Sequence, residues 1–172
     1  MDVADRIIRA FLPNLAGEVE TVAATWHRGA RLYSPDSFTV TVEAQAVAIP
    51  ERLYVDERRG GDATACLFTR HHDGFVRQRA LAQVLLLDEP WATPFVVRLV
   101  GEYVIEIVEQ IDEAFSKQLP RNLAAFVSAN PDFIRLTRAR VTSYWNCYFR
   151  ATPRREHIGF RVMDRIEAAA IP

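Results

Sequence analysis

The sequence predicts a mainly α-helical (α+β) fold, an antiparallel helical bundle with a small antiparallel β element near the N-terminus. Two observations support this fold class. Apolar side chains recur at helical spacing along most of the chain after residue 61, and residues 38–46 alternate apolar with polar side chains at the period of a strand. We therefore expect one domain, residues 1–172, with a helix and the β element in residues 1–60 and helices throughout 61–172.

Composition excludes several classes of protein. Apolar residues make up 49% and charged residues 25% of the chain, as in an ordinary globular domain. A net charge of −1 gives no general attraction to nucleic acid or to anionic lipid. The N-terminal sequence MDVADRIIRAFLP lacks the basic and long apolar regions of a signal peptide, and no stretch of about 18 apolar residues occurs. We expect a cytoplasmic protein that does not enter membranes.

The first elements follow from periodicity and from turn residues. A short amphipathic helix is predicted over residues 3–12, ended by Pro13 and Gly17, whereas residues 18–33 fit a helix and a strand alike. The next expected elements are a strand over 38–48 ended by Pro50, a short strand over 52–55, and an exposed connection at 58–61 that marks an internal boundary.

Helical spacing predicts the remaining elements. Helices are expected over residues 63–71, 74–87, 91–115, 123–128, 130–150 and 158–169. The longest carries Pro94 in its first turn, where a missing amide is tolerated, and Gly101 leaves a step in it open. Cys66 and Cys147 lie in apolar segments, so we expect two buried free thiols and neither a disulfide framework nor a zinc site.

The densest group of polar residues is TRHHDGFVRQR, residues 69–79. Asp73 directly precedes an apolar helical stripe, so its carboxylate is predicted to cap the helix that begins at Gly74. Arg77 stands one turn later and is expected to pair with Asp73. Arg70, His71 and His72 would then end the preceding helix, where cationic side chains interact well with the C-terminal dipole. This interpretation gives every residue of the segment a structural role.

Residues 73–84 resemble the D-x-x-V-R-x-x-A-x-x-x-L pattern of HEAT-like helical repeats, with Val84 in the final Leu position. That resemblance implies HEAT-like helical hairpins, with residues 91–115 as the second helix, and a role in protein interaction. The pattern occurs once, covering about forty residues with its hairpin, and stacked repeats need neighbours. The whole chain also resembles small bacterial proteins that carry the same TRHHDGFVRQR stretch and have no assigned activity.

A ligand-binding or metal-binding site is the main alternative for this segment. Adjacent helical residues point about 100° apart, so His71 and His72 cannot share one ion on a regular helix, and the His-x-x-x-His spacing is missing. We expect no metal and no cofactor. A polar pocket that gathers Arg70, His71, His72, Asp73, Arg77 and Glu102 remains an open alternative.

Catalysis has little support from the sequence. Four glutamates run along one face of the predicted helix 91–115 and are expected to be solvated: Glu102, Glu106, Glu109 and Glu113. The opposite face is expected to be buried: Val104, Ile107, Val108 and Ile111. No nucleophile elbow, reactive-cysteine signature, phosphate loop or dinucleotide fingerprint occurs, so no catalytic residue is assigned.

Nucleic-acid binding is disfavoured. Residues 135–155 mix arginines with Tyr144, Trp145, Tyr148 and Phe149, a combination that could stack single-stranded bases. The aromatic residues form one broad stripe, however, which we expect to face the core. The sequence therefore favours a non-catalytic interaction module that binds a protein partner or a second copy of itself, with a small enzyme or ligand-binding protein as the alternative.

Overall fold

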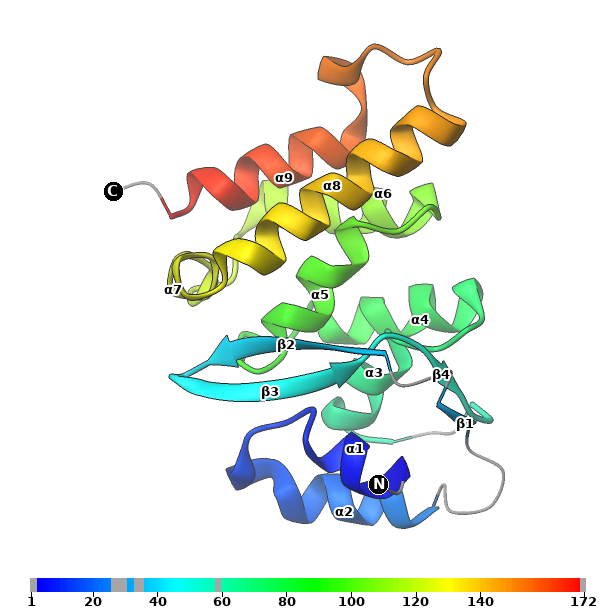
Figure 1. Ribbon diagram of the computed structural model, residues 1–172, viewed down its shortest axis with the longest axis vertical. Helices are drawn as coiled ribbons and strands as arrows, with labels where there is room; N and C mark the ends of the chain where they lie inside the picture. The colour runs from blue at the N-terminus through cyan, green and yellow to red at the C-terminus, as the bar shows by residue number, and fades with distance from the viewer. Residues whose placement is uncertain (1–2, 26–30, 33–35, 58–59, 171–172) are drawn as a thin grey trace. The chain divides into compact units, whose positions relative to one another are not determined.

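The computed structural model describes residues 3–25, 31–32, 36–57 and 60–170 (Figure 1). The chain divides into two compact units, Met1–Leu87 and Asp88–Pro172. The division lies after Leu87, so the boundary expected at residues 58–61 falls within the first unit, and two of its four residues lie outside the described ones. The mainly α fold with a small antiparallel β element near the N-terminus is confirmed.

The first unit begins with two helices that pack on each other. Helix α1 covers Val3–Ile8, the 3₁₀ turn η1 covers Pro13–Leu15, and α2 covers Ala16–Thr25. The expected helix 3–12 is therefore shorter than predicted. The ambiguous segment 18–33 is helical up to Thr25; of its remainder, only the two-residue strand β1, Arg31–Leu32, lies within the described residues.

A β-hairpin replaces the single strand expected over residues 38–48. Strand β2, Ser37–Val42, pairs antiparallel with β3, Gln45–Pro50, and the turn between them is Glu43–Ala44. Both turn residues have positive φ, 48° and 63°, as a two-residue hairpin of type I′ requires. The one-strand prediction was wrong because this turn lacks the Asn or Gly that usually marks it. The even-numbered apolar residues of β2 are buried, but after the turn the odd-numbered apolar residues of β3 face the core. Val47 and Ile49 are therefore buried and Ala46 is exposed.

The rest of the first unit joins the short strand β4 to two helices. Strand β4, Leu53–Tyr54, pairs antiparallel with β1, as the expected short strand at 52–55 suggested. Helix α3, Asp62–Phe68, packs against α2 and against α4, Gly74–Val84. Both helices lie close to their predicted positions, but α3 ends before Arg70 and His71. These two residues therefore belong to the connection between α3 and α4.

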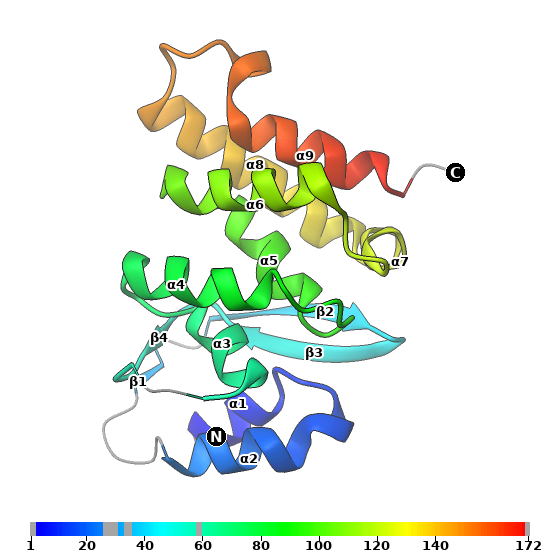
Figure 2. The ribbon, with the colours of Figure 1, turned by 180° about the vertical axis from the view of Figure 1, so that it is seen from behind.

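The second unit is helical within the described residues. Its elements are α5, Thr93–Val100; α6, Ile105–Lys117; α7, Leu123–Ala129; α8, Pro131–Tyr148; the 3₁₀ turn η2, Arg154–Glu156; and α9, Ile158–Ala168. Helices α6, α7, α8 and α9 all pack on α5, and α6 and α8 each pack on α9 (Figure 2). Every residue of α5 is buried. The core of this unit therefore surrounds α5.

The helix expected over residues 91–115 is two helices, α5 and α6, separated at Gly101–Val104. A Cβ atom on Gly101 would lie 3.1 Å from the Cβ of Arg140, so glycine allows the end of α5 to approach α8 closely. Pro94 lies in the first turn of α5, as predicted. Ile107, Val108 and Ile111 are buried, whereas Val104, at the separation, is only half-buried. Of the expected glutamate face, Glu106, Glu109 and Glu113 are exposed, whereas Glu102 lies outside α6 and is buried.

Two expectations about the end of α8 were wrong. The buried stripe of this helix comprises Phe133, Ile134, Thr137 and Val141, and it stops before the aromatic residues that were expected in the core. Tyr148 is 68% exposed, and Tyr144, Trp145 and Phe149 are half-buried. Cys147 is exposed rather than buried, whereas Cys66 is buried as expected, and burial raises the pKa of its thiol.

Candidate functional site

In the segment 69–79, residues 69–73 connect α3 to α4 and contact strand β4, and residues 74–79 form the first turns of α4. The amide of Leu53 donates to the carbonyl of Arg70 at 2.7 Å, and the amide of His72 donates to the carbonyl of Leu53 at 2.8 Å. These two hydrogen bonds form a parallel bridge between Leu53 and His71. The segment is thus an irregular strand-like connection whose main chain is held by hydrogen bonds to β4.

Arg70 is buried, with 1% of its surface exposed, and its guanidinium faces main-chain oxygens. Nη2 donates to the carbonyl of Glu51 at 2.7 Å and Nε donates to the carbonyl of Pro50 at 3.3 Å. Its guanidinium also lies over the ring of Phe38, 5.8 Å from the ring centroid. Arg70 therefore ties the end of the hairpin to the α3–α4 connection rather than ending a helix as predicted.

His71 is buried, and both of its ring nitrogens have partners. Nδ1 accepts from the amide of Asp73 at 3.0 Å, and Nε2 lies 2.7 Å from the carbonyl of Val55. Because a carbonyl only accepts, this arrangement places the proton of a neutral ring on Nε2. His72 is exposed and stacks on the ring of Tyr54 at 4.7 Å. Both ring nitrogens of His71 are therefore engaged within the fold.

Asp73 and Arg77 complete the segment. Asp73 caps α4 as predicted, since its Oδ1 accepts from the amide of Phe75 at 2.8 Å. This hydrogen bond holds the pKa of the Asp73 carboxyl below its usual value. Arg77 is 1% exposed, and its Nη1 donates to the carbonyls of His71 and His72 at 2.9 Å each. The guanidinium thus binds main-chain oxygens instead of the Asp73 carboxylate that the sequence suggested.

The structure brings together Arg70, His71, His72, Asp73 and Arg77, all in the first unit. Glu102, the sixth candidate, lies in the second unit, between α5 and α6. Within the described residues, no group of three or more His, Cys, Asp or Glu side chains is arranged to hold a metal ion. The contacts of the segment 69–79 are those of a structural connection.

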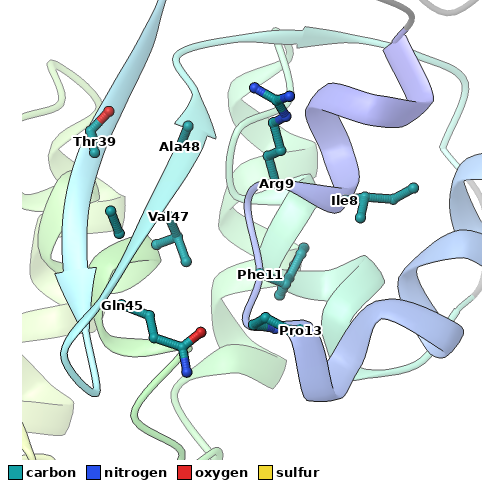
Figure 3. A pocket seen from close by; sticks show the side chains of 9 residues that line it. Ile8, Arg9, Phe11, Pro13, Thr39, Gln45, Val47 and Ala48 are labelled. Carbon is teal, nitrogen blue, oxygen red and sulfur yellow. The ribbon is translucent and has the colours of Figure 1, made fainter.

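A pocket of about 520 Å³ lies elsewhere in the first unit, between α1–η1 and the hairpin (Figure 3). Its lining is mainly apolar and comprises Ile8, Arg9, Phe11, Pro13, Thr39, Gln45, Ala46, Val47 and Ala48. Among the described residues of this lining, Arg9 is the one that carries a charge. The volume lies within the range of small-molecule and peptide pockets.

The pocket lies along an open edge of β3. In a two-residue hairpin the closing pair, Val42 and Gln45, is hydrogen-bonded, and the bonded pairs then alternate along the strands. Ala46 and Ala48 therefore direct their amides and carbonyls away from β2. The amide of Ala48 confirms this direction, because it donates to the carbonyl of Arg9 at 2.9 Å. Among the described residues, none hydrogen-bonds the outward main-chain groups of Ala46, which is exposed.

Arg9 follows α1 and is exposed. Its carbonyl occupies the Ala48 position of the β3 edge, and its side chain extends past Ala48, at the opposite end of the strand from Gln45 (Figure 3). Within the described part of the chain, no carboxylate pairs with its guanidinium. The pocket therefore combines an apolar wall, a strand edge that is open at Ala46 and an exposed cation.

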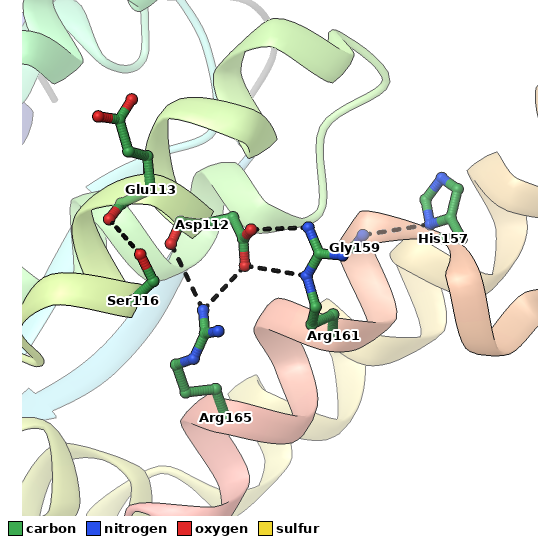
Figure 4. A network of polar contacts seen from close by, with 7 residues as sticks. All are labelled: Asp112, Glu113, Ser116, His157, Gly159, Arg161 and Arg165. Carbon is green, nitrogen blue, oxygen red and sulfur yellow. Dashed lines mark hydrogen bonds and ion pairs between the residues drawn. The ribbon is translucent and has the colours of Figure 1, made fainter.

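The polar groups of the second unit form contacts between helices. Asp112 on α6 accepts from Arg161 Nη2 at 2.7 Å and from Arg165 Nη1 at 2.8 Å, both on α9 (Figure 4). Partial burial raises the pKa of Asp112, but the hydrogen bonds from the two arginines outweigh it, so the pKa lies below its usual value. His157 caps α9 by accepting from the amide of Gly159 at 3.2 Å, and burial lowers the pKa of its ring.

Comparisons with known proteins give no assignment: no family model, no curated protein and no solved structure matches the chain. Within the described residues, no helix has the length and apolar character needed to cross a membrane.

Sequence reasoning missed the pocket and its two most informative residues, Arg9 and Ala46. Arg9 lies within the predicted amphipathic helix 3–12, where no pattern in the sequence distinguishes it from other polar residues. Ala46 was placed on the buried face of one continuous strand, because the Glu43–Ala44 turn has no glycine or asparagine. The available signal was length: the predicted strand, residues 38–48, has eleven residues, which exceeds the mode of about 5–6 residues for strands and favours a hairpin.

Proposed function

We propose that the protein is a cytoplasmic, non-catalytic protein-interaction module that binds an extended peptide segment of its partner along the edge of β3. The observation that carries this proposal is the outward amide and carbonyl of Ala46, which lie beside a pocket of about 520 Å³. An exposed strand edge recruits extended peptides because the missing strand supplies main-chain hydrogen bonds and adjacent pockets accept alternate side chains. The resemblance of residues 73–84 to HEAT-like helices supports the same class of function by analogy.

The alternative, a catalytic or ligand-binding pocket around His71, His72, Arg77 and Glu102, has weaker support. Both ring nitrogens of His71 are engaged in hydrogen bonds, and Arg77 binds two main-chain carbonyls. A catalytic base or a ligand-binding cation needs a group that can face a substrate. The described contacts of His71 and Arg77 use that capacity inside the fold.

The test removes the outward amide of Ala46 without disturbing the hairpin. Proline is tolerated where the strand amide faces away from the ladder, so Ala46→Pro should retain the pairing of β2 with β3. Ser37→Pro is the matched control, because Ser37 is the exposed first residue of β2 and its amide also points away from the ladder. Circular dichroism melting of both variants verifies that they fold.

Binding is measured by fluorescence anisotropy with peptides selected on the wild-type chain from a displayed random peptide library. We expect Ala46→Pro to weaken the selected peptides by about tenfold or more and Ser37→Pro to leave their affinity unchanged. Protection of the Ala46 amide from hydrogen exchange in the complex is a second expected result. Selected peptides that bind Ala46→Pro as tightly as the wild type, or a library that yields no binder, would refute the proposal.

A further inference from the structure

We infer that the segment bound at this edge is the C-terminal end of a partner chain, which runs parallel to β3 and places its terminal carboxylate at Arg9. This inference rests on the proposed function and specifies the chemistry of the partner. It follows from three properties of the site: one end of the edge is closed, the one charged residue among the described residues of the lining is a cation, and the wall is apolar.

The edge of β3 is open only near the turn. The carbonyl of Arg9 already accepts from the amide of Ala48, so the main chain of the protein itself occupies the edge at that position. Ala46 lies two residues nearer the turn, which is roughly 7 Å along a strand. A peptide strand that enters from the turn and pairs with Ala46 therefore meets the Arg9 main chain within about two residues. The geometry favours a segment that ends there over one that continues.

Charge decides which end of a peptide fits. Arg9 is the one charged residue of the lining, is exposed, and has no carboxylate partner among the described residues. A terminal carboxylate would form a charge-assisted hydrogen bond with its guanidinium, whereas a terminal ammonium group would be repelled. Because the closed end of the edge is the Ala48 end, a peptide whose C-terminus lies there runs in the same direction as β3.

The wall of the pocket specifies the last side chain. Buried Phe11 and Val47, half-buried Ile8 and exposed Pro13 provide an apolar surface beside the edge. A terminal residue such as Val, Leu or Phe would cover this surface, whereas Lys would bring a second cation close to Arg9. The inferred ligand is thus a free C-terminus with an apolar final residue.

The experiment compares free and blocked C-termini on the full chain. The probes are fluorescein-labelled peptides Gly-Ser-Gly-Thr-Val-X, where X is Val, Leu, Phe or Lys, each as the free acid and as the C-terminal amide. We expect the free acids with apolar X to bind in preference to the Lys peptide, and their amides to bind about tenfold more weakly. Arg9→Gln should reduce the affinity of each free acid to that of its amide and leave the amide unchanged. Arg135→Gln, at an exposed arginine on α8, is the matched control and should change neither affinity.

The outcomes separate this inference from the proposed function. Equal binding of acid and amide, or binding that Arg9→Gln leaves unchanged, overturns the C-terminal inference. The proposed function still stands in that case if the library-selected peptides lose affinity on Ala46→Pro. Dodecanoate is included as a small carboxylate without a peptide main chain. If it binds in an Arg9-dependent manner while neither these probes nor any library peptide binds, the site takes small amphipathic acids, and both proposals are overturned.

Discussion

The two units use arginine in contrasting ways. In the first unit, Arg70 and Arg77 are 1% exposed and donate to main-chain carbonyls of irregular segments. In the second, Arg138 and Arg161 reach carboxylates on neighbouring helices and remain partly exposed. Helices satisfy their own main-chain groups, whereas the connections around β4 and residues 71–72 leave carbonyls that need donors. Arg70 and Arg77 are therefore structural parts of the core of the first unit, whereas Arg138 and Arg161 link neighbouring helices at the surface of the second.

The largest expected loss of stability follows from replacing Arg77, the buried arginine of α4. Arg77→Ala leaves the carbonyls of His71 and His72 without this donor and opens a cavity, so it should cost about 3 kcal/mol or more of unfolding free energy. Differential scanning calorimetry measures the loss, and hydrogen exchange should show faster exchange in residues 69–79. Arg79→Ala is the matched control on the same helix, because Arg79 is exposed and pairs with the exposed Glu57. If Arg77→Ala melts like Arg79→Ala, the contrast between buried and surface arginines is wrong.

The segment around Arg77 also shows how far the sequence predicts this structure. The cap at Asp73 and the start of α4 were predictable, because capping is a local interaction between residues two apart. The acceptors of Arg70 were not, since Pro50 and Glu51 lie about twenty residues away and are main-chain atoms that leave no trace in side-chain patterns. Helices with long apolar stripes were predicted well. A step at Gly101 was left open by the sequence, and whether the helix separates there depends on the approach of α8.

The candidate site was less predictable than the fold. The polar segment 69–79 attracted attention because its residue types resemble those of active sites, yet the described contacts of its buried members are structural. The pocket at β3 depends on a strand register, and Ala46 acquires its role only because the hairpin turns at Glu43–Ala44. A site whose key group is a main-chain amide has no side-chain signature in a single sequence.

An intermediate loss of stability is expected when the ion pairs between α6 and α9 are removed. Asp112→Asn removes the charge that binds Arg161 and Arg165 and should cost about 1 kcal/mol or less, because Arg161 is 53% exposed and solvent screens the pair. The cost should decrease in high salt, unlike that of Arg77→Ala. Chemical denaturation at low and high ionic strength measures both. If the destabilisation does not depend on salt, the contacts of Asp112 behave like the buried contacts of the first unit, and the surface interpretation is wrong.

The Asp112 carboxylate also makes the stability of the folded protein depend on pH. The pKa of Asp112 is lower in the folded protein than its usual value of about 3.9, so its contribution to stability is fully present above that value. The contribution is lost as the pH falls through the folded pKa. Asp112→Asn should therefore lose less stability than the wild type between about pH 5 and pH 2. Glu109→Gln is the neighbouring control, since Glu109 is an exposed carboxylate on the same helix.

The smallest expected loss of stability follows from replacing Asp73, which caps α4. Asp73 is exposed, and its carboxylate accepts one main-chain hydrogen bond, from Phe75. Asp73→Ala should lower the melting temperature only slightly, and Asp73→Ser, which retains an acceptor for that amide, should lower it even less. The sharper measurement is hydrogen exchange of the Phe75 amide, which should accelerate in Asp73→Ala and stay near wild type in Asp73→Ser. This ordering tests what holds the connection between α3 and α4 in place. If Asp73→Ala destabilises the protein as much as Arg77→Ala, the connection depends on the cap of α4, and the buried guanidinium is secondary.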